Sequence, residues 1–184
     1  MRRLLIVFLL LASAVSAPMA ARAQAGDLET GFYLGRYSAT ALSVAYELVY
    51  LESLIDEVKP EAITDEAINS DTTDAQMAQH ALVYTVWRVQ FFLDPMIEDA
   101  NSSDSFAHPA LAPMREPTVA ALNGVKAARD AFMDAETTDL TALAKFNQAL
   151  KDGGYVNKLM ELAAQAADAA GVSDAGEGEA APEQ

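Results

Sequence analysis

The side chains able to do chemistry are few in this sequence. His80 and His108 are the only histidines, and there is no cysteine. The lack of cysteine excludes disulfides, thiolate nucleophiles, thiolate metal sites and covalently attached c-type haem. The two histidines, with an acid such as Asp104, would suit a metal of borderline type if the loop around His108 folds back toward His80. A partly exposed His80 and a loop His108 without metal is the preferred interpretation, so we expect no metal site and no cofactor.

No catalytic motif is present. The sequence contains no Gly-x-Ser-x-Gly, phosphate loop, His-Glu-x-x-His or dinucleotide fingerprint. The acidic stretch from Asp99 to Asp104 lacks the turn glycine and closing glutamate of a calcium loop, which favours a solvated loop. Haem held by Met96 or Met114 with a histidine is a further alternative, although methionines more often fill cores. We therefore expect that the protein is not an enzyme.

One arginine, Arg88, lies in the most apolar stretch that follows the first 25 residues. A buried charge must be paired, and Glu47 or Glu52 is the expected partner. Two alternatives stay open: the side chain extends to the surface, or it anchors an anion in an aromatic-lined pocket. The candidate ligand-binding residues are accordingly Arg88, Tyr84, Trp87 and Phe91.

These residues belong to the segment 75–97, which we expect to form a helix at the centre of the fold. Its apolar residues repeat at helical spacing on two stripes. The first is Leu82, Val86, Val89, Leu93 and Met96; the second is Met77, Ala81, Tyr84, Arg88 and Phe91. A helix that is apolar nearly all round is buried on most sides, so other helices should surround it. A strand is the competing assignment, but the segment is long for one.

A second long helix is predicted from Asp27 to Lys59, before Pro60. Its apolar residues alternate steps of three and four, as in a helix-packing seam: Leu34, Tyr37, Ala41, Val44, Leu48, Leu51, Ile55 and Val58. Near the end of the central helix, Asp94 as N-cap and Pro95 in the first turn predict a bend or a restart.

The connection 101–116 is long, and its large apolar residues are Phe106, Leu111 and Met114. Long loops in compact domains often have a function, and we expect this one to be a lid over the second stripe. Further helices are predicted from Pro117, in a first turn, and from Thr137, with a break at Gly153-Gly154. The fold class is therefore all-α, an antiparallel up-down bundle of four main helices with breaks near Pro95 and Gly153-Gly154.

The amino-terminal residues 1–25 have the features of a secretory signal peptide: Arg2 and Arg3, an apolar run from Leu4 to Ala12, and a small-x-small site ending at Ala25. Removing them takes away three arginines and no acid, which changes the net charge from −15 to −18. The bundle domain should span 26–171, and residues 172–184 should form a disordered acidic tail.

These features predict an exported binding or interaction module, periplasmic or secreted. The high negative charge disfavours nucleic acid as a partner, and no membrane span is expected in the mature chain because Arg88 interrupts a short apolar run. The partner is a protein or a small molecule, and a homodimer is an open alternative. The competing function is a carrier of a small ligand, metal or haem in a pocket beside the helix 75–97.

Overall fold

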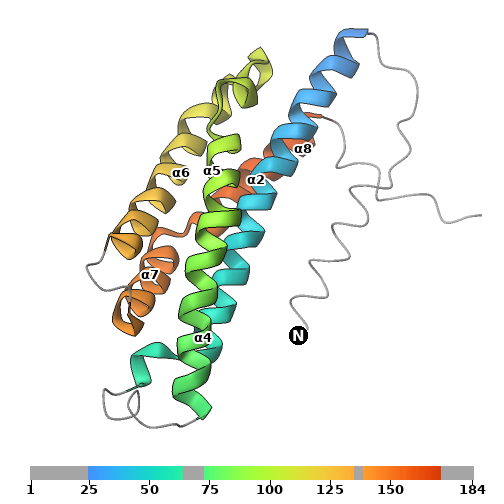
Figure 1. Cartoon of the computed structure of the whole chain (residues 1–184). Coiled ribbons are helices and arrows are strands. Elements are labelled where there is room, and N and C mark those ends of the chain that lie inside the picture. Colours follow the sequence, from blue (N-terminus) through green and yellow to red (C-terminus); the bar gives the residue numbers. More distant parts are fainter. Residues whose placement is uncertain (1–24, 64–72, 135–138, 171–184) are drawn as a thin grey trace, which may run out of the picture.

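The computed structural model describes residues 25–63, 73–134 and 139–170, and every regular element in these ranges is a helix (Figure 1). The all-α prediction is confirmed for this part of the chain. The predicted signal segment, except Ala25, and the predicted acidic tail lie outside it, as does the predicted helix start at Thr137. Among the described residues no helix is both long and apolar enough to cross a membrane.

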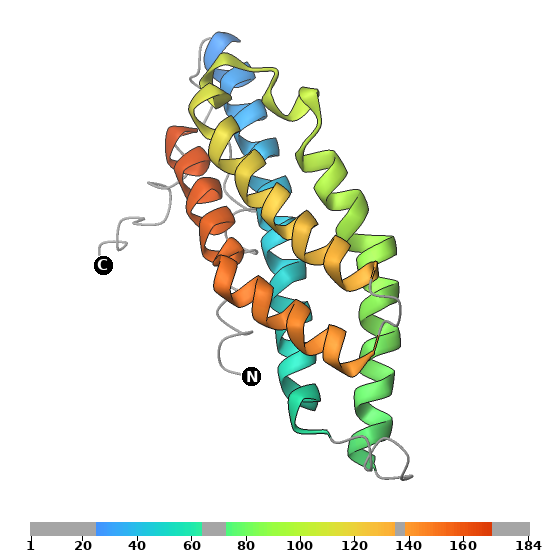
Figure 2. The same cartoon turned by 90° about the vertical axis from the view of Figure 1, so that its left-hand side faces the viewer.

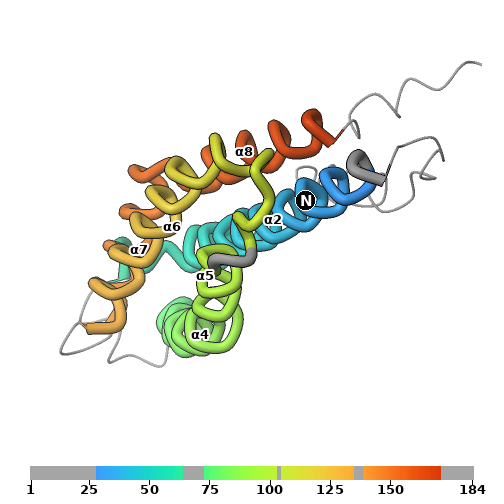
Figure 3. Tube along the Cα trace, turned by 90° about the horizontal axis from the view of Figure 1, so that it is seen from above, coloured from blue at the N-terminus to red at the C-terminus, as the bar shows by residue number. Residues whose placement is uncertain are grey.

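The first helix, α2, spans Ala25–Val58 and is followed by a short 3-10 helix, η1, at Pro60–Ala62. Lys59, between them, has a left-handed backbone with φ of 44°. The predicted seam of α2 is buried from Leu34 to Ile55, and Val58 packs at its edge. Viewed along the bundle, α2 lies between α8 and the α4–α5 rod (Figure 3). The central element of the fold is therefore α2, and the expectation that segment 75–97 is central is wrong.

That segment forms one long rod made of α4 (Thr73–Arg88), a π-helical turn η2 (Val89–Leu93) and α5 (Asp94–Ala100). Neither a stop nor an N-cap occurs at Asp94, whose backbone is helical and whose N–H donates to the carbonyl of Val89. The π-turn ends two residues before Pro95, whose ring would otherwise crowd the preceding α-helical turn. The Asp94 carboxylate accepts hydrogen bonds from Arg129 at 2.9 and 2.5 Å, which joins α5 to α6.

The connection after α5 contains two 3-10 helices, η3 (Ser103–Phe106) and η4 (Pro109–Leu111), and the start of α6 (Ala112–Met133). Pro117 lies inside α6 rather than in its first turn, because Pro113 takes that place. The anchors of this connection pack against the amino-terminal half of α2 and against α8, in a small cluster containing Leu34, Tyr37, Leu111, Met114 and Leu162. The prediction that it covers the second stripe of α4 is wrong.

The last two helices are α7 (Leu140–Gly153) and α8 (Tyr155–Ala169). The Asp139 carboxylate caps α7 by accepting the Ala142 N–H at 2.8 Å. Gly154 ends α7 with φ of 59°, so the predicted break is confirmed. Together α7 and α8 form a bent pair that runs opposite to α6 (Figure 2). The count of four main helices is not confirmed, because α7 and α8 are separate helices and a π-turn divides α4 from α5.

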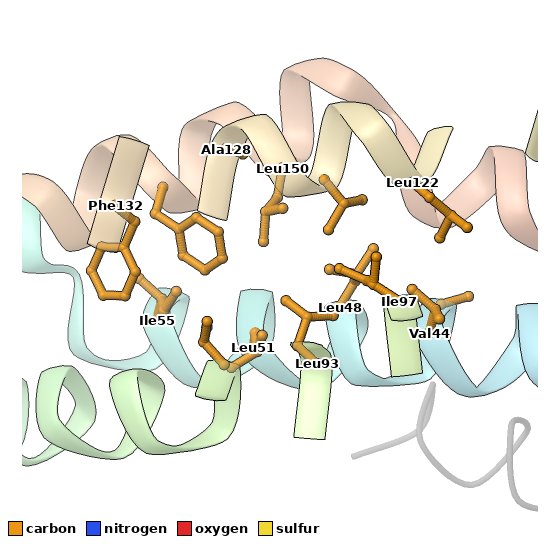
Figure 4. Packing of buried hydrophobic residues seen from close by; sticks show 14 of the residues in the cluster. Val44, Leu48, Leu51, Ile55, Leu93, Ile97, Leu122, Ala128, Phe132 and Leu150 are labelled. Carbon is orange, nitrogen blue, oxygen red and sulfur yellow. The ribbon is translucent and has the colours of Figure 1, made fainter. Parts of the chain in front are cut away.

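The main core lies between α2 and the other helices (Figure 4). Val44, Leu48, Leu51 and Ile55 of α2 meet Leu93 and Ile97 from the α4–α5 rod, and Leu122, Phe132 and Leu150 from α6 and α7. Phe132 and Phe146 stack with ring centroids 4.9 Å apart. The core therefore surrounds α2, and only one side of α4 packs into it.

Candidate binding face on α4

Helix α4 buries small side chains and exposes large ones. Its buried residues are Ala75, Ala78, Ala81 and Thr85. Five large apolar residues of the same rod are exposed, Met77 by 47%, Val83 by 69%, Tyr84 by 37%, Trp87 by 42% and Phe91 by 63%, whereas Val89, Leu93 and Ile97 on its other side are buried. The second stripe, predicted to be buried, is therefore mostly on the surface. The alanines let α4 approach its neighbours closely, and those neighbours cover one side of it only. We call Met77, Val83, Tyr84, Trp87 and Phe91 the aromatic face.

Arg88 lies at the border between this aromatic face and the core. Its Nε donates to Glu47 Oε1 at 2.7 Å, and its Nη2 donates to Glu47 Oε2. The side chain of Glu47 is 3% exposed and that of Arg88 is 18% exposed. The expected internal pair is confirmed, with Glu47 as the partner rather than Glu52. The hydrogen bond to Glu47 raises the pKa of Arg88 above its ordinary value, although partial burial opposes the shift.

The guanidinium of Arg88 is also held by aromatic rings. Its Cζ lies 4.4 Å from the ring centroid of Tyr50 and 4.5 Å from that of Phe92. Such cation–π contacts stabilise by roughly 0.5–1 kcal/mol each when exposed and by more when desolvated. The ring of Tyr84 lies further away, with its centroid 5.9 Å from the same Cζ. Because Glu47 and these three rings already engage the cation, Arg88 has a structural role that fixes the orientation of the rings around it.

The aromatic side chains form a continuous ladder across the face. Tyr50 of α2 meets Tyr84 edge-on at 6.4 Å, Tyr84 stacks on Trp87 at 5.5 Å, and Trp87 is 6.1 Å from Phe91. A hydrogen bond to Tyr84 raises the pKa of Tyr50, and the same bond lowers the pKa of Tyr84. The rings are thus ordered by one another, and side chains that are already ordered lose less entropy in any contact that they make.

A groove of about 710 Å³ runs beside this ladder, between the end of α2 and the start of α4. Its lining is mainly apolar, with two groups that carry or can carry charge, Glu57 and His80. The other lining residues are Leu54, Val58, Met77, Ala81, Val83, Tyr84 and Trp87. Two of the four candidate ligand-binding residues, Tyr84 and Trp87, therefore line one groove. Arg88 is not among the lining residues, and Phe91 continues the face along the rod.

The two histidines do not come together. His108 stacks on Tyr33 and lies 3.4 Å from Thr30, near the start of α2. His80 lines the groove near Val58, at the other end of α2. At 1.5 Å per residue, the 25 residues between Tyr33 and Val58 correspond to roughly 38 Å. The described residues contain no group of three or more metal-ligating side chains, and the alternative in which the loop brings His108 to His80 does not occur. His108 instead caps η4, where its Nδ1 accepts the Ala110 N–H at 3.2 Å.

Sequence reasoning missed the contribution of α2 to this face. Tyr50 and Leu54 lie one turn apart on α2, and both border the groove or the ladder. A signal was present, since Tyr50 lies three residues after Glu47 and therefore on the same side of the helix. Once Glu47 is taken as the partner of Arg88, Tyr50 is placed next to Tyr84.

Comparison of the chain with protein-family models, with curated proteins and with solved structures finds no match. The features of this chain that bear on function are therefore the chemistry of the aromatic face and its groove.

Proposed function

We propose that the protein is an exported, non-enzymatic interaction module that binds a partner through the aromatic face of α4. One observation carries the proposal: five large apolar side chains at helical spacing are exposed on a single rod. Tyrosine and tryptophan are enriched among the residues that dominate binding energy at protein interfaces. The ordered ladder from Tyr50 to Phe91 supplies such residues in a fixed arrangement.

The absence of carboxylates from this face supports the same function. Between Ala75 and Leu93 the chain has no Asp or Glu, although the whole sequence has 27. Charged residues are depleted at the cores of protein interfaces because burying them unpaired is costly. The single arginine of the stretch, Arg88, is neutralised by Glu47.

Export is the second part of the proposal and is supported by the first 25 residues of the sequence. The basic start, apolar run and small-x-small site predict cleavage between Ala25 and Gly26, so the protein acts in the periplasm or outside the cell. The intact mass of the exported protein tests this, with a chain beginning at Gly26 as the expected result. A chain that keeps Leu4 to Leu11 contradicts it.

The scaffold of this module is, in our proposal, an up-down bundle of four rods. Its rods are α2, the α4–α5 rod, α6, and the bent pair α7 and α8. The opposite directions of neighbouring rods in Figure 2 support this grouping.

Photo-crosslinking tests partner binding. A photoreactive amino acid replaces Val83, which is 69% exposed on the aromatic face, and in a matched control it replaces Gln165, an exposed residue of α8. In cells that export the protein, we expect crosslinked adducts from position 83 and few from position 165. Equal yields at the two positions contradict the proposal.

A second candidate function, transport of a small ligand, is favoured by the size of the groove. Small-molecule sites usually have volumes of about 300–1,000 Å³, and the groove is within this range. Because Arg88 is engaged by Glu47, such a ligand would be apolar rather than anionic. Native mass spectrometry of protein from the export compartment distinguishes the functions: a bound small molecule supports the carrier, and a bound protein supports the interaction module.

A further inference from the structure

The second stripe of the rod has the spacing of a helix-packing seam, and three of its five members, Met77, Tyr84 and Phe91, are exposed. The stripe runs through Met77, Ala81, Tyr84, Arg88 and Phe91 in alternating steps of four and three residues. This is the same alternation that α2 uses from Leu34 to Ile55, where other helices of the chain cover it. On the outer side of α4, no helix among the described residues covers the aromatic face. The stripe from Met77 to Phe91 is about 21 Å long at 1.5 Å per residue, enough for a partner helix of roughly 14 residues.

Two exposed carboxylates lie at one end of the groove. Glu57, near the end of α2, is part of the groove lining. Asp74, in the first turn of α4, is exposed and precedes the lining residue Met77 by three positions, so the two share a side of the helix. The end of α2 and the start of α4 meet at the same end of the groove, because Val58 and Met77 both line it.

The aromatic face itself has no acidic residue. From Ala75 to Leu93 there is neither Asp nor Glu, so the negative charge is confined to the end with Glu57 and Asp74. In a chain of net charge −15, this acidic end attracts Lys and Arg of a partner.

We propose that the groove between α2 and α4 binds an amphipathic helix of a partner protein, with its apolar residues on Tyr84 and Trp87 and its basic residues facing Glu57 and Asp74. Helix-in-groove recognition uses apolar anchors at i, i+3 or i+4, and i+7, which matches the spacing on α4. The inference rests on the proposed function and adds the chemistry of the partner.

A second copy of the chain is a poorer occupant. From Thr73 to Leu93 the only lysine or arginine is Arg88, and Glu47 already engages it. The same face of another copy therefore has no free lysine or arginine to offer to Glu57 and Asp74, and each copy has a net charge of −15. A cationic helix on a different protein removes that repulsion.

The single tryptophan of the chain makes the test direct. Trp87 is 42% exposed within the aromatic face, so its fluorescence reports on the groove. The purified protein is titrated with three synthetic peptides of 14 residues that contain no tryptophan. The first has a leucine stripe at helical spacing with lysines at both ends, so that either orientation brings a cation to the two carboxylates. The second has glutamates in place of the lysines, and the third has the composition of the first in an order that destroys the stripe.

We expect the first peptide to bind about tenfold or more tightly than the other two. Added salt should weaken its binding, because the carboxylates at the end of the groove are exposed and salt screens them. The assignment of a cationic helix is overturned if the glutamate peptide binds as tightly as the lysine peptide. It is also overturned if the scrambled peptide binds as tightly as the lysine peptide.

Two variants test the residues themselves. Glu57→Lys combined with Asp74→Asn makes the end of the groove positive without placing a cation in the first turn of α4, and it should shift the preference to the glutamate peptide. The matched control, Glu161→Lys combined with Asp168→Asn, makes the same change of charge at exposed positions of α8 and should leave the preference as in the wild type. Val83→Asp places a charge on the aromatic face and should weaken binding of the leucine–lysine peptide at least about tenfold. Thermal melts of each variant check that the fold is kept.

The remaining outcomes separate this inference from the proposed function. Crosslinks from position 83 to a second copy overturn the inference and show that the face is an interface between copies. A change in Trp87 fluorescence with neutral phosphatidylcholine vesicles, and none with the peptides, overturns it and shows that the face binds lipid. If position 83 gives no crosslinks and no peptide binds, the proposed function fails as well.

Discussion

Glu47 and Arg88 form a bidentate ion pair, with Nε 2.7 Å from Oε1 and Nη2 on Oε2, that joins the middle of α2 to the end of α4. The carboxylate is almost fully buried, and the guanidinium lies toward the exposed ring of Tyr50 and toward Phe92. The pair therefore connects the core to the aromatic face. Removing either partner should therefore lower the free energy of unfolding and also make the surrounding rings less ordered.

The burial of the two partners predicts unequal effects of removing them. Arg88→Met leaves the buried carboxylate of Glu47 without a partner and should lower the free energy of unfolding by about 3–5 kcal/mol. Glu47→Gln leaves a cation that is closer to water and still contacts the rings, so its cost should be smaller. The double variant should recover part of the loss. Denaturant titrations of the wild type, both single variants and the double variant measure this coupling.

Additive losses in that cycle, with coupling under about 0.5 kcal/mol, would show that the pair does not act as one unit. Near-UV circular dichroism of the same variants reports on ring order. Arg88→Met should weaken the aromatic signal, because Tyr50 and Phe92 lose the cation that both rings contact.

Removing the charge of Glu52, the other partner considered for Arg88, should raise the free energy of unfolding at neutral pH, whereas removing Arg88 lowers it. Burial raises the pKa of Glu52, and the charge of nearby Asp56 adds to the shift while Lys151 opposes it. A raised pKa in the folded state means that folding favours the protonated acid. Stability is therefore lost as the pH rises from the ordinary value of about 4.3 through the higher folded pKa.

At pH 7 the Glu52→Gln variant should consequently be more stable than the wild type, by under about 1 kcal/mol because the site is partly exposed. Below about pH 4 the two proteins should melt alike. Thermal melts on both sides of that pH check this, and a loss of stability at neutral pH would show that the Lys151 interaction outweighs burial.

The helices were predictable because their signals are local. The seam of α2, the end before Pro60, the α7 cap at Asp139 and the break at Gly154 follow from residues close together in the sequence. That Arg88 pairs with a carboxylate was also predictable, since a cation among apolar residues needs one. The sequence left Glu47 and Glu52 both open as the partner.

The exposure of the aromatic face was not predictable, for a physical reason. Periodicity shows that Tyr84 and Phe91 share a side of the helix, but it does not show whether another helix covers that side. The buried ridge of α4 consists of Ala75, Ala78, Ala81 and Thr85, which have weak hydrophobic signals. The lid prediction failed similarly, because Phe106 and Leu111 fit two apolar surfaces equally well by sequence and pack on α2 and α8.

The contrast between core and face predicts opposite responses to truncation of aliphatic side chains. Leu48 is fully buried at the centre of the main core, and Leu48→Ala should cost about 2–5 kcal/mol. Val83, 69% exposed on the aromatic face, should change stability by less than about 0.5 kcal/mol when it is replaced by alanine. Denaturant titration measures both. A cost for Leu48→Ala as small as that of Val83→Ala would place this residue outside the core.

Two glycines allow the backbone at the α7–α8 break to be tested with a matched substitution. At Gly35 and at Gly154 an added Cβ meets no atom within 4 Å, so steric contact does not distinguish them. Gly35 lies within α2, where alanine has the higher helix propensity, and Gly35→Ala should stabilise by roughly 0.5–1 kcal/mol. Gly154 has φ of 59°, and Gly154→Ala should destabilise by roughly 1–2 kcal/mol because a side chain with Cβ disfavours this region.

Asparagine tolerates left-handed backbone better than alanine, so the stability of Gly154→Asn should fall between that of the wild type and that of Gly154→Ala. Thermal melts of the three variants at one pH measure the effect. Equal shifts for Gly35→Ala and Gly154→Ala would mean that α7 and α8 do not require a left-handed residue between them.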